Sequence, residues 1–280
     1  MDVIFKAELE SFLREDGLES HWPYWLSLPQ DFVECQIFVK SDLVLSGVPF
    51  FQGVFELLSG TRSEELMGLR RYEGEKLKES KQPFFSFKLP FGVALTGERL
   101  ALNLLSHCSA IATETSILAE RARPFGIKIL ETRKTLPGLK AFQKYAVQIG
   151  GGYNHRTTQT DVWMIKDNHK AYFGGIAEAL DFFNTQGALY QNTIVEIHDL
   201  KELEEAMALG VKHFLLDNFS PEKISRALEL KKEGMIIELS GGINESNLDS
   251  FLILGVDAIS IGALTYAPKA VDISLKIKKV

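Results

Sequence analysis

The C-terminal half of the chain repeats one structural pattern three times, and this pattern constrains the fold more than any other feature. Each time, a segment with helical periodicity ends in glycine and a short apolar run follows. The runs are VKHFLLDN after Gly210, MIIELSGG after Gly234 and VDAISIGA after Gly255. Glycine is the common residue just past a helix end, where the backbone turns left-handed. Alternating helices and almost wholly apolar strands indicate a parallel sheet covered by helices, as a barrel or an open sheet.

The segments between these runs carry helix start signals. Asp199 followed by Glu202 resembles a capping box, and Ser220 before Pro221 is typical of an N-cap and the first helical residue. Upstream, DVWMIKD and NTIVEI are predicted strands, and GIKIL and VQIGGGY lead into polar residues in the same way. The βα pattern therefore covers more than the three glycine-marked units.

The first hundred residues lack this regularity. Extended pieces such as ECQIFVKSDLVLSG and PFFSFKLPFGVALTG alternate with helical stretches. A long helix is predicted over about residues 98–121, with Leu104, Cys108 and Ile111 on its apolar stripe. We expect an N-terminal α+β domain, smaller than the βα part, with this helix leading into the βα units.

Composition excludes several classes of protein. The chain has 280 residues, 45% of them hydrophobic, which is enough for one barrel or two modest domains. A net charge of −6 argues against a partner such as nucleic acid or an anionic membrane. The start, MDVIFKAELESFLRED, lacks the features of a signal peptide, and Cys35 and Cys108 form no metal-binding pattern. We expect a soluble, cytoplasmic protein with a buried Cys108 thiol.

Charged and small polar residues gather where the predicted strands end. In a parallel barrel all of these ends open on one face, and core strands carry so many charges only when the charges share a site. Early strands end in cations, middle strands in acids and the last two in glycines. The residues are Glu131, Arg133, Lys134, Asn154, His155, Arg156, Lys166, Asp167, Asn168, Glu196, Asp217, Asn218, Ser240, Gly241, Gly242, Gly262 and Ala263.

Each group favours a particular chemistry. Closely set cations fit a ligand with several carboxylates or phosphates. The run SGG, followed by a predicted helix start at Asn244, would bring backbone N–H groups to a phosphate. Two carboxylates, Glu196 and Asp217, can bind Mg²⁺ or ribose hydroxyls, or stabilise a cationic transition state. Together the groups indicate a phosphorylated sugar and a polycarboxylate as ligands.

Taken singly, the same residues have simpler interpretations. A strand-end lysine such as Lys166 is commonly solvated or ion-paired, and Glu196 and Asp217 could merely neutralise nearby cations. Many turns between helix and strand resemble SGG. The histidines His169, His198 and His213 are expected to be structural. Spacing alone therefore predicts a shared anion site and leaves its chemistry open.

The run ETRKTLPGLKAFQKYAVQIGGGYNHR, followed by IKDNH, LLDNF, SGGI and IGALT, resembles the quinolinate phosphoribosyltransferase family. The similarity is dense over about residues 96–264, where TGERLALN opens it, and loose before that. The resemblance implies an N-terminal α/β sandwich over residues 1–109, to which residues 267–280 return. It also implies an incomplete, seven-stranded-type parallel α/β barrel over residues 110–266.

The resemblance further implies a reaction and a set of residue roles. The family joins quinolinate to phosphoribosyl pyrophosphate with Mg²⁺, giving nicotinate mononucleotide, pyrophosphate and CO₂ for NAD biosynthesis. The implied quinolinate ligands are Arg133, His155, Arg156 and Lys166, with Arg99 from the partner subunit of a homodimer or of a hexamer of dimers. Lys134 would face the phosphates, Glu196 and Asp217 the ribose and the metal, and the 5′-phosphate would lie on Ser240, Gly241, Gly242, Gly262 and Ala263. Glu196, Asp217, Lys134 and Lys166 are the implied catalytic residues.

Three features depart from the family pattern: the stretch GLESHWPYWLS, Ile194 in place of an acid, and Tyr266 in place of histidine. Two alternatives share the fold. One is a molybdenum-transport-associated paralogue, which would bind phosphoribosyl pyrophosphate but not quinolinate. The other is a non-catalytic phosphosugar-binding protein, which would not need both Glu196 and Asp217. A Schiff-base aldolase that uses Lys166 is a third alternative.

Overall fold

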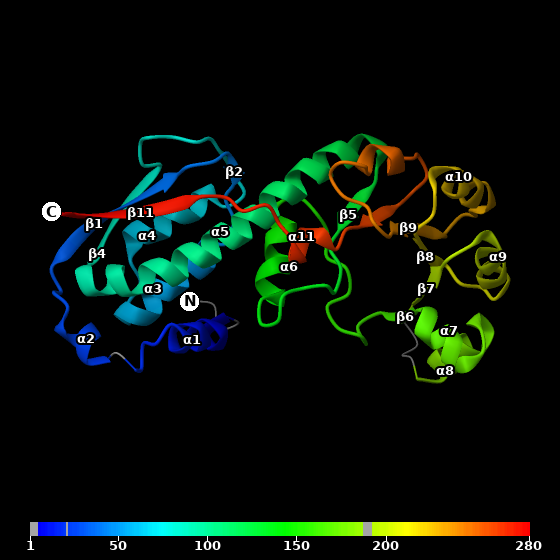
Figure 1. The fold of residues 1–280 in the computed structure, drawn as a ribbon, viewed down its shortest axis with the longest axis horizontal. Coiled ribbons are helices and arrows are strands. Elements are labelled where there is room, and N and C mark those ends of the chain that lie inside the picture. Colours follow the sequence, from blue (N-terminus) through cyan, green and yellow to red (C-terminus); the bar gives the residue numbers. More distant parts are fainter. Residues whose placement is uncertain (1–4, 21, 187–191) are drawn as a thin grey trace. The chain divides into compact units, whose positions relative to one another are not determined.

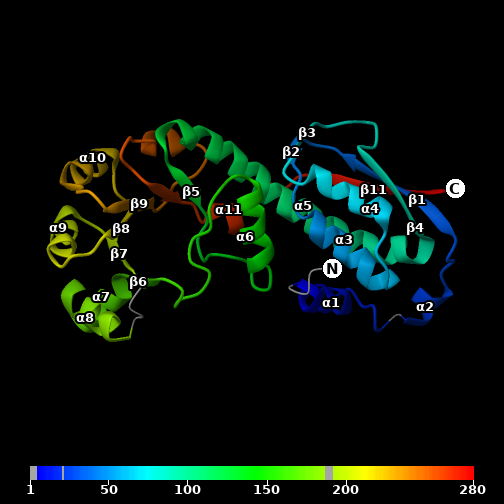
Figure 2. The same cartoon turned by 180° about the vertical axis from the view of Figure 1, so that it is seen from behind.

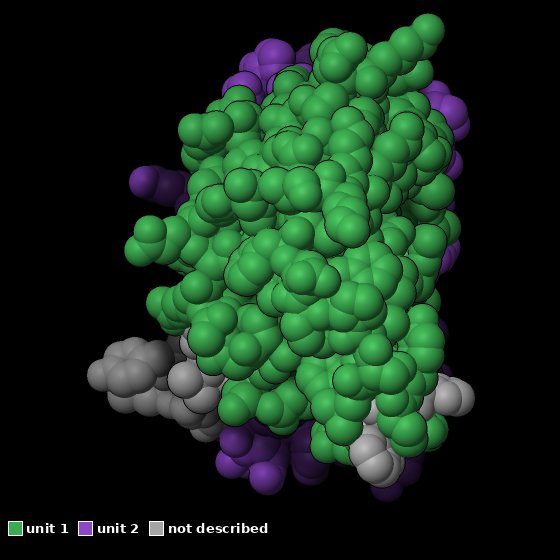
Figure 3. All heavy atoms as spheres, turned by 90° about the vertical axis from the view of Figure 1, so that its left-hand side faces the viewer, with its two compact units in different colours: residues 1–116, 136–151, 267–280 green, residues 117–135, 152–266 purple. Residues whose placement is uncertain are grey.

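The computed structural model describes residues 5–20, 22–186 and 192–280. Figures 1 and 2 show the ribbon from opposite sides. The chain forms two compact units, which are coloured separately in Figure 3. Unit 1 comprises Met1–Ser116, Leu136–Gly151 and Ala267–Val280, and unit 2 comprises Ile117–Thr135 and Gly152–Tyr266. Both units are therefore built from segments far apart in the sequence.

Unit 1 is an antiparallel sheet packed with helices. Its strands run in the order β11-β1-β4, with a separate β2-β3 pair. The elements are α1 (Lys6–Glu15), α2 (Trp22–Ser27), β1 (Phe32–Val39), β2 (Leu43–Val44), α3 (Val48–Ser59), α4 (Glu64–Met67), η2 (Gly68–Tyr72), β3 (Lys76–Leu77), β4 (Phe85–Pro90), most of α5 (Phe91–Ala122), α6 (Lys140–Ile149) and β11 (Ile273–Lys279). The chain end thus returns as the strand beside β1.

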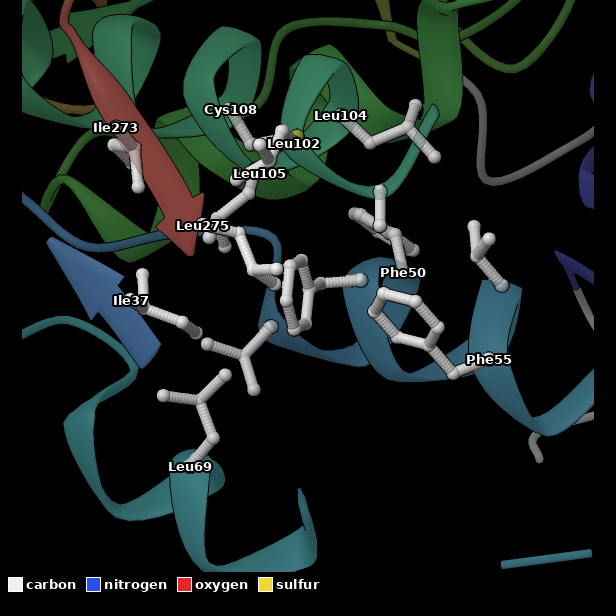
Figure 4. Close-up of a cluster of buried hydrophobic side chains, with 14 of the residues drawn as sticks. Ile37, Phe50, Phe55, Leu69, Leu102, Leu104, Leu105, Cys108, Ile273 and Leu275 are labelled. Atoms are coloured by element: carbon white, nitrogen blue, oxygen red, sulfur yellow. The ribbon is translucent and has the colours of Figure 1, made fainter. Parts of the chain in front are cut away.

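The core of unit 1 is rich in aromatic and branched side chains. Phe50 and Phe55 of α3 meet Leu105 and Cys108 of α5 and Leu275 of β11 in one cluster (Figure 4). Cys108 is fully buried and makes no disulfide, as predicted, and burial raises the pKa of its thiol. Cys108 is therefore a core residue.

Two local predictions in this part of the chain are wrong. VQIGGGY is not a strand: residues 140–149 form α6, because Phe142, Ala146 and Val147 recur on one helix face and are buried in the core of unit 1. The extended piece PFFSFKLPFGVALTG is extended only as far as Pro90, where α5 begins. Gly92 and Gly97 lie in that helix, and a Cβ added at either position would come within 2.7 Å of a neighbouring side chain.

Unit 2 contains a six-stranded, wholly parallel sheet in the order β5-β10-β9-β8-β7-β6. Its elements are η3 (Arg123–Phe125), β5 (Lys128–Leu130), β6 (Trp163–Ile165), α7 (Asp167–Phe173), α8 (Ile176–Gln186), β7 (Thr193–Ile197), α9 (Leu200–Ala208), β8 (His213–Asp217), α10 (Pro221–Leu230), β9 (Ile236–Ser240), η4 (Leu248–Phe251), β10 (Ala258–Ser260) and α11 (Ala263–Tyr266). The predicted α/β class, with its parallel sheet, is confirmed. Where a seventh strand was expected, Tyr153 makes a single parallel bridge to Leu130.

The predicted helix starts are confirmed in unit 2. Asp199 accepts a hydrogen bond from the N–H of Glu202, and Ser220 accepts one from the N–H of Lys223.

Strand register separates two faces of the sheet, since side chains alternate along a strand. Val195, Phe214 and Ile237 lie on the face that packs against α8, α9 and α10. Figure 1 shows these helices along one side of β6–β9.

The opposite face of the same strands carries the polar side chains, among them Glu196, His213, Asp217, Glu238 and Ser240.

In the described part of the chain, no helix has the combined length and apolarity that crossing a bilayer requires.

Candidate active site

Asp217 and Ser240 are register partners at the C-terminal ends of β8 and β9. The Ser240 hydroxyl donates to Asp217 Oδ1 at 2.7 Å, and Asn218 Nδ2 donates to Asp217 Oδ2 at 2.7 Å. Asn218 has φ of +56°, and no other described residue except glycine has a positive φ. Non-glycine residues held in the left-handed region cluster at functional sites. These contacts give the Asp217 carboxylate one fixed orientation.

Glu196 is the corresponding acid of β7, and its side chain is buried. The Lys166 ammonium, at the start of α7, contacts Glu196 Oε2, and His198 Nε2 lies 3.7 Å from Glu196 Oε1. Lys170 Nζ donates to the Glu196 carbonyl at 3.1 Å and to both Glu202 carboxylate oxygens at 2.8 Å. The end of β7 is thus tied to α7 and α9.

Arg156 supplies a guanidinium to the same region. Burial, and next the charge of Arg133, lower the pKa of Arg156. Arg156 Nη1 donates to the carbonyls of Gln159 and Val162 at 3.1 and 3.2 Å. Asp161 closes this loop by accepting the N–H of residue 157 at 2.6 Å and of residue 158 at 3.0 Å. A guanidinium held in one orientation this way suits an anionic ligand.

His155 lies beside Arg156 and contacts two buried acids. The backbone N–H of His155 donates to Glu131 Oε1 at 3.0 Å, and its ring Nε2 lies 3.2 Å from Glu238 Oε1. Glu238, in the middle of β9, also contacts His213 Nε2 through Oε2 at 3.0 Å. Burial by itself raises the pKa of Glu238, but hydrogen bonds from the two histidines outweigh it and lower the pKa to about 2.

The strand-end pattern assigns no role to Glu238, although a carboxylate within the apolar run IIELS is a visible signal. Glu131 is among the predicted strand-end residues, without a predicted role. His213, predicted to be structural, is the neighbour of Glu238. These residues lie on the polar face of the sheet because of the register between neighbouring strands. A single sequence does not determine that register.

Lys134 lies against the turn that follows β10. A Cβ atom on Gly262 would come within 3.2 Å of Lys134 Cδ and 3.0 Å of the Tyr266 ring. Thr265 Oγ1 donates to the Lys134 carbonyl at 2.8 Å, which joins the end of β5 to α11. A lysine packed beside the glycine of this turn suits the binding of an anionic group.

The helix start predicted at Asn244 is wrong. The Asn244 N–H donates to Asn247 Oδ1 at 2.8 Å, and the chain forms turns and then η4 instead of an α-helix. The small size of Gly241 is nevertheless required: its φ is +94°, and a Cβ there would lie 2.3 Å from Asn218 Oδ1 and 2.7 Å from its backbone nitrogen. The run SGG therefore supplies close backbone packing beside Asp217 and no helix dipole.

In the structure, Lys166 thus forms an ion pair with Glu196, Ser240 donates a hydrogen bond to Asp217, and Lys134 packs beside Gly262. Gly242 lies in the bend after β9, and Ala263 is the first residue of α11. Arg99 lies on α5 within unit 1, whereas the other predicted site residues are in unit 2. No cluster of three or more His, Cys, Asp or Glu side chains suited to a metal occurs among the described residues.

The fold and these contacts define the class: an α/β barrel-type protein whose parallel strands end in cations, carboxylates and close-packed glycines. Residues 111–276 match the family described as quinolinate phosphoribosyl transferase, C-terminal domain. The chain is 38% identical over 247 residues to a probable nicotinate-nucleotide pyrophosphorylase (carboxylating) of Methanocaldococcus jannaschii, covering 85% of this chain and 84% of that protein. It is 34% identical to the human nicotinate-nucleotide pyrophosphorylase (carboxylating), covering 98% of this chain and 92% of the human one.

Among solved structures, NadC from Streptococcus pyogenes superimposes with a TM-score of 0.88 at 32% identity, over 100% of this chain and 99% of that one. The nicotinate-nucleotide pyrophosphorylase from Ehrlichia chaffeensis does so with a TM-score of 0.86 at 29% identity, over 99% of this chain. This chain belongs to the quinolinate phosphoribosyltransferase family.

Proposed function

We propose that this protein transfers the phosphoribosyl group of phosphoribosyl pyrophosphate to quinolinate, releasing pyrophosphate and CO₂ and forming nicotinate mononucleotide. One observation carries the proposal: Lys166 pairs with the buried Glu196 carboxylate at the strand ends, and Arg156 is held there by the carbonyls of Gln159 and Val162. A planar ligand with two adjacent carboxylates neutralises such a cluster, and arginine offers the two-pronged geometry that carboxylates accept.

The quinolinate carboxylates lie with Arg133, Arg156 and Lys166, and His155 belongs to the same site. Arg99 comes from the partner subunit of a homodimer, alone or within a hexamer of dimers. Arg99 lies on α5 in unit 1, and the residues that it would join lie in unit 2. Such an interface makes each site the product of two chains.

Phosphoribosyl pyrophosphate lies on the other side of the acids. Lys134 faces its phosphates. The 5′-phosphate lies at the C-terminal ends of β9 and β10 and on the residues that follow, at Ser240, Gly241, Gly242, Gly262 and Ala263. Support comes from Gly242, where nothing lies within 4 Å of an added Cβ, so that its backbone is open to close approach. Phosphate binding after the last two strands is common in barrel enzymes.

The chemistry proceeds in two steps. The pyridine nitrogen forms a bond to C1 of the ribose while the C1–O bond breaks and its electron pair leaves with pyrophosphate. Glu196 and Asp217 stabilise the positive charge that develops on the sugar. The adjacent carboxylate then leaves as CO₂, its bonding electrons pass to the ring carbon next to the pyridinium nitrogen, and a proton takes its place.

Mg²⁺ is the proposed metal, held by Glu196 and Asp217 directly or through water. The donors fit, because Mg²⁺ prefers oxygen ligands and usually binds one or two carboxylates together with substrate phosphates and water. When bound, it neutralises charge on the departing pyrophosphate. The anchoring of Asp217 by Ser240 and Asn218 keeps that carboxylate oriented for such a role. The proposed compartment is the cytoplasm, in keeping with an acidic chain of net charge −6.

Pyrophosphate release tests the function. Purified protein is given phosphoribosyl pyrophosphate and Mg²⁺ with either quinolinate or nicotinate. We expect release with quinolinate only, matched by nicotinate mononucleotide and CO₂, because nicotinate lacks the second carboxylate that the basic cluster binds. A folded protein that releases pyrophosphate with neither acid would contradict the proposal.

A further inference from the structure

Both ring nitrogens of His155 have partners within the protein. The Arg156 N–H donates to His155 Nδ1 at 2.6 Å, and Nε2 lies 3.2 Å from Glu238 Oε1. A nitrogen that accepts a hydrogen bond carries no proton, so the proton of a neutral ring is on Nε2 and points to Glu238. The side chain is only 8% exposed. His155 therefore presents no free ring nitrogen to a ligand.

Glu238 is a fixed anion below His155. It is 1% exposed, and its two oxygens contact three side chains from three segments: His155, His213 of β8 and the Ser260 hydroxyl of β10. A buried carboxylate is tolerated only when it is hydrogen-bonded in this way. Glu238 thus connects the middle of the sheet to the segment that carries Arg156.

Arg156 is held at both ends. Its backbone N–H donates a hydrogen bond to His155 Nδ1, and its Nη1 donates to the carbonyls of Gln159 and Val162. A guanidinium has five N–H donors, so several remain for a carboxylate after these contacts. Its orientation is then decided by the protein before any ligand binds, which lowers the ordering cost of binding.

We propose that Glu238 is a positioning residue for quinolinate: through the His155 ring it fixes the backbone of Arg156 and so aims the Arg156 guanidinium. His155 then acts on Arg156 and makes no direct contact with quinolinate. This inference deepens the proposed function and rests on it. It predicts that loss of Glu238 weakens quinolinate binding and spares the phosphoribosyl pyrophosphate side of the site.

The test uses Glu238→Gln in the full chain, with Ser260→Ala as the matched control. Gln keeps the volume and removes the charge, while Ser260→Ala removes a contact to the same Oε1 and leaves the charge. We expect the quinolinate Kd, measured by calorimetry, to rise about tenfold in Glu238→Gln, and the KM for phosphoribosyl pyrophosphate to stay within about twofold. Ser260→Ala should leave both values within about twofold of wild type.

A double variant separates positioning from general damage. If Glu238 acts through His155, then Glu238→Gln combined with His155→Ala should bind quinolinate no more weakly than His155→Ala alone. Additive losses would overturn the inference. So would an unchanged quinolinate Kd in folded Glu238→Gln, or equal losses for both substrates.

A measurement on the wild-type protein does not depend on any variant folding. Side-chain ¹⁵N NMR of the neutral His155 ring should show the proton on Nε2; a proton on Nδ1 would overturn the inference. The two proposals also fail differently. Wild-type protein that releases no pyrophosphate with quinolinate contradicts the proposed function, whereas active wild-type protein with a fully competent Glu238→Gln variant contradicts this inference alone.

Discussion

At the residue scale, the acids of the candidate site differ in what they contact, and this difference separates their roles. Glu196 touches Lys166 at the edge of the polar face, whereas Glu238 is enclosed by histidines and a serine. A carboxylate beside a partly exposed cation can act on a substrate, and an enclosed one can only orient its neighbours. The sequence pattern predicted the first kind, because a charge at a strand end is conspicuous, and overlooked the second.

Glu196→Gln should lower turnover far more than quinolinate binding. The amide cannot stabilise positive charge on the ribose, so we expect kcat to fall about 100-fold or more, the range seen when a transition-state electrostatic contact is removed. The quinolinate Kd should not weaken, because removal of the charge frees Lys166 from its ion pair. Steady-state kinetics and calorimetry measure the two effects. Equal losses in both would show that Glu196 is a binding residue only.

Glu238 should make stability depend on pH in the acid range. Its folded pKa of about 2 lies below the ordinary value of 4.5, so the carboxylate stabilises the fold above pH 4.5 and loses that contribution as pH falls from 4.5 towards 2. The free energy of unfolding of wild type minus that of Glu238→Gln should therefore shrink across this range. Urea titrations at several pH values measure it, and a difference independent of pH would contradict the assignment.

At the element scale, one glycine of the run IGGGY decides how α6 packs. Gly150 has an ordinary helical backbone, but a Cβ there would lie 2.5 Å from the Ala112 carbonyl and 2.7 Å from Thr115 Cβ, both on α5. The sequence alone predicts VQIGGGY as a strand that leads into polar residues. In the structure, Gly150 is required because α5 and α6 approach each other closely there.

Gly150→Ala should therefore destabilise unit 1, by about 1–3 kcal/mol as for other overpacked sites, although alanine favours helix. Gly151→Ala is the comparison: nothing lies within 4 Å of its added Cβ, and only its φ of +83° opposes the change. Urea unfolding of both variants measures the effect. A Gly150→Ala protein as stable as wild type would mean that α5 and α6 can separate without cost.

At the scale of the whole molecule, the proposed partner-derived Arg99 makes activity a property of the dimer. Arg99→Ala and Lys166→Ala should each be nearly inactive. When their subunits are refolded together, about half of the dimers are mixed, and each mixed dimer has one complete site of its two. About a quarter of all sites should therefore recover activity. Pyrophosphate release measures the recovery.

The control mixture combines an Arg133→Ala subunit with a Lys166→Ala subunit. Both changes lie in unit 2, which supplies the rest of each site from a single chain. In that mixture every site retains one defective unit, so activity should not return. Recovery in the control, or none in the test mixture despite subunit exchange, would contradict the contribution of Arg99 from a partner.

The sequence by itself determined the parallel α/β fold, the helix caps at Asp199 and Ser220, and the residues that end the strands. These properties depend on local periodicity and on neighbours a few positions apart, which a single chain displays directly. Only the tertiary structure decided that residues 140–149 join unit 1 as a helix, that SGG opens no helix, and that Glu238 lies under His155. Each of these results depends on contacts between segments far apart in the sequence, because burial and strand register choose among local conformations that the sequence leaves nearly equal in free energy.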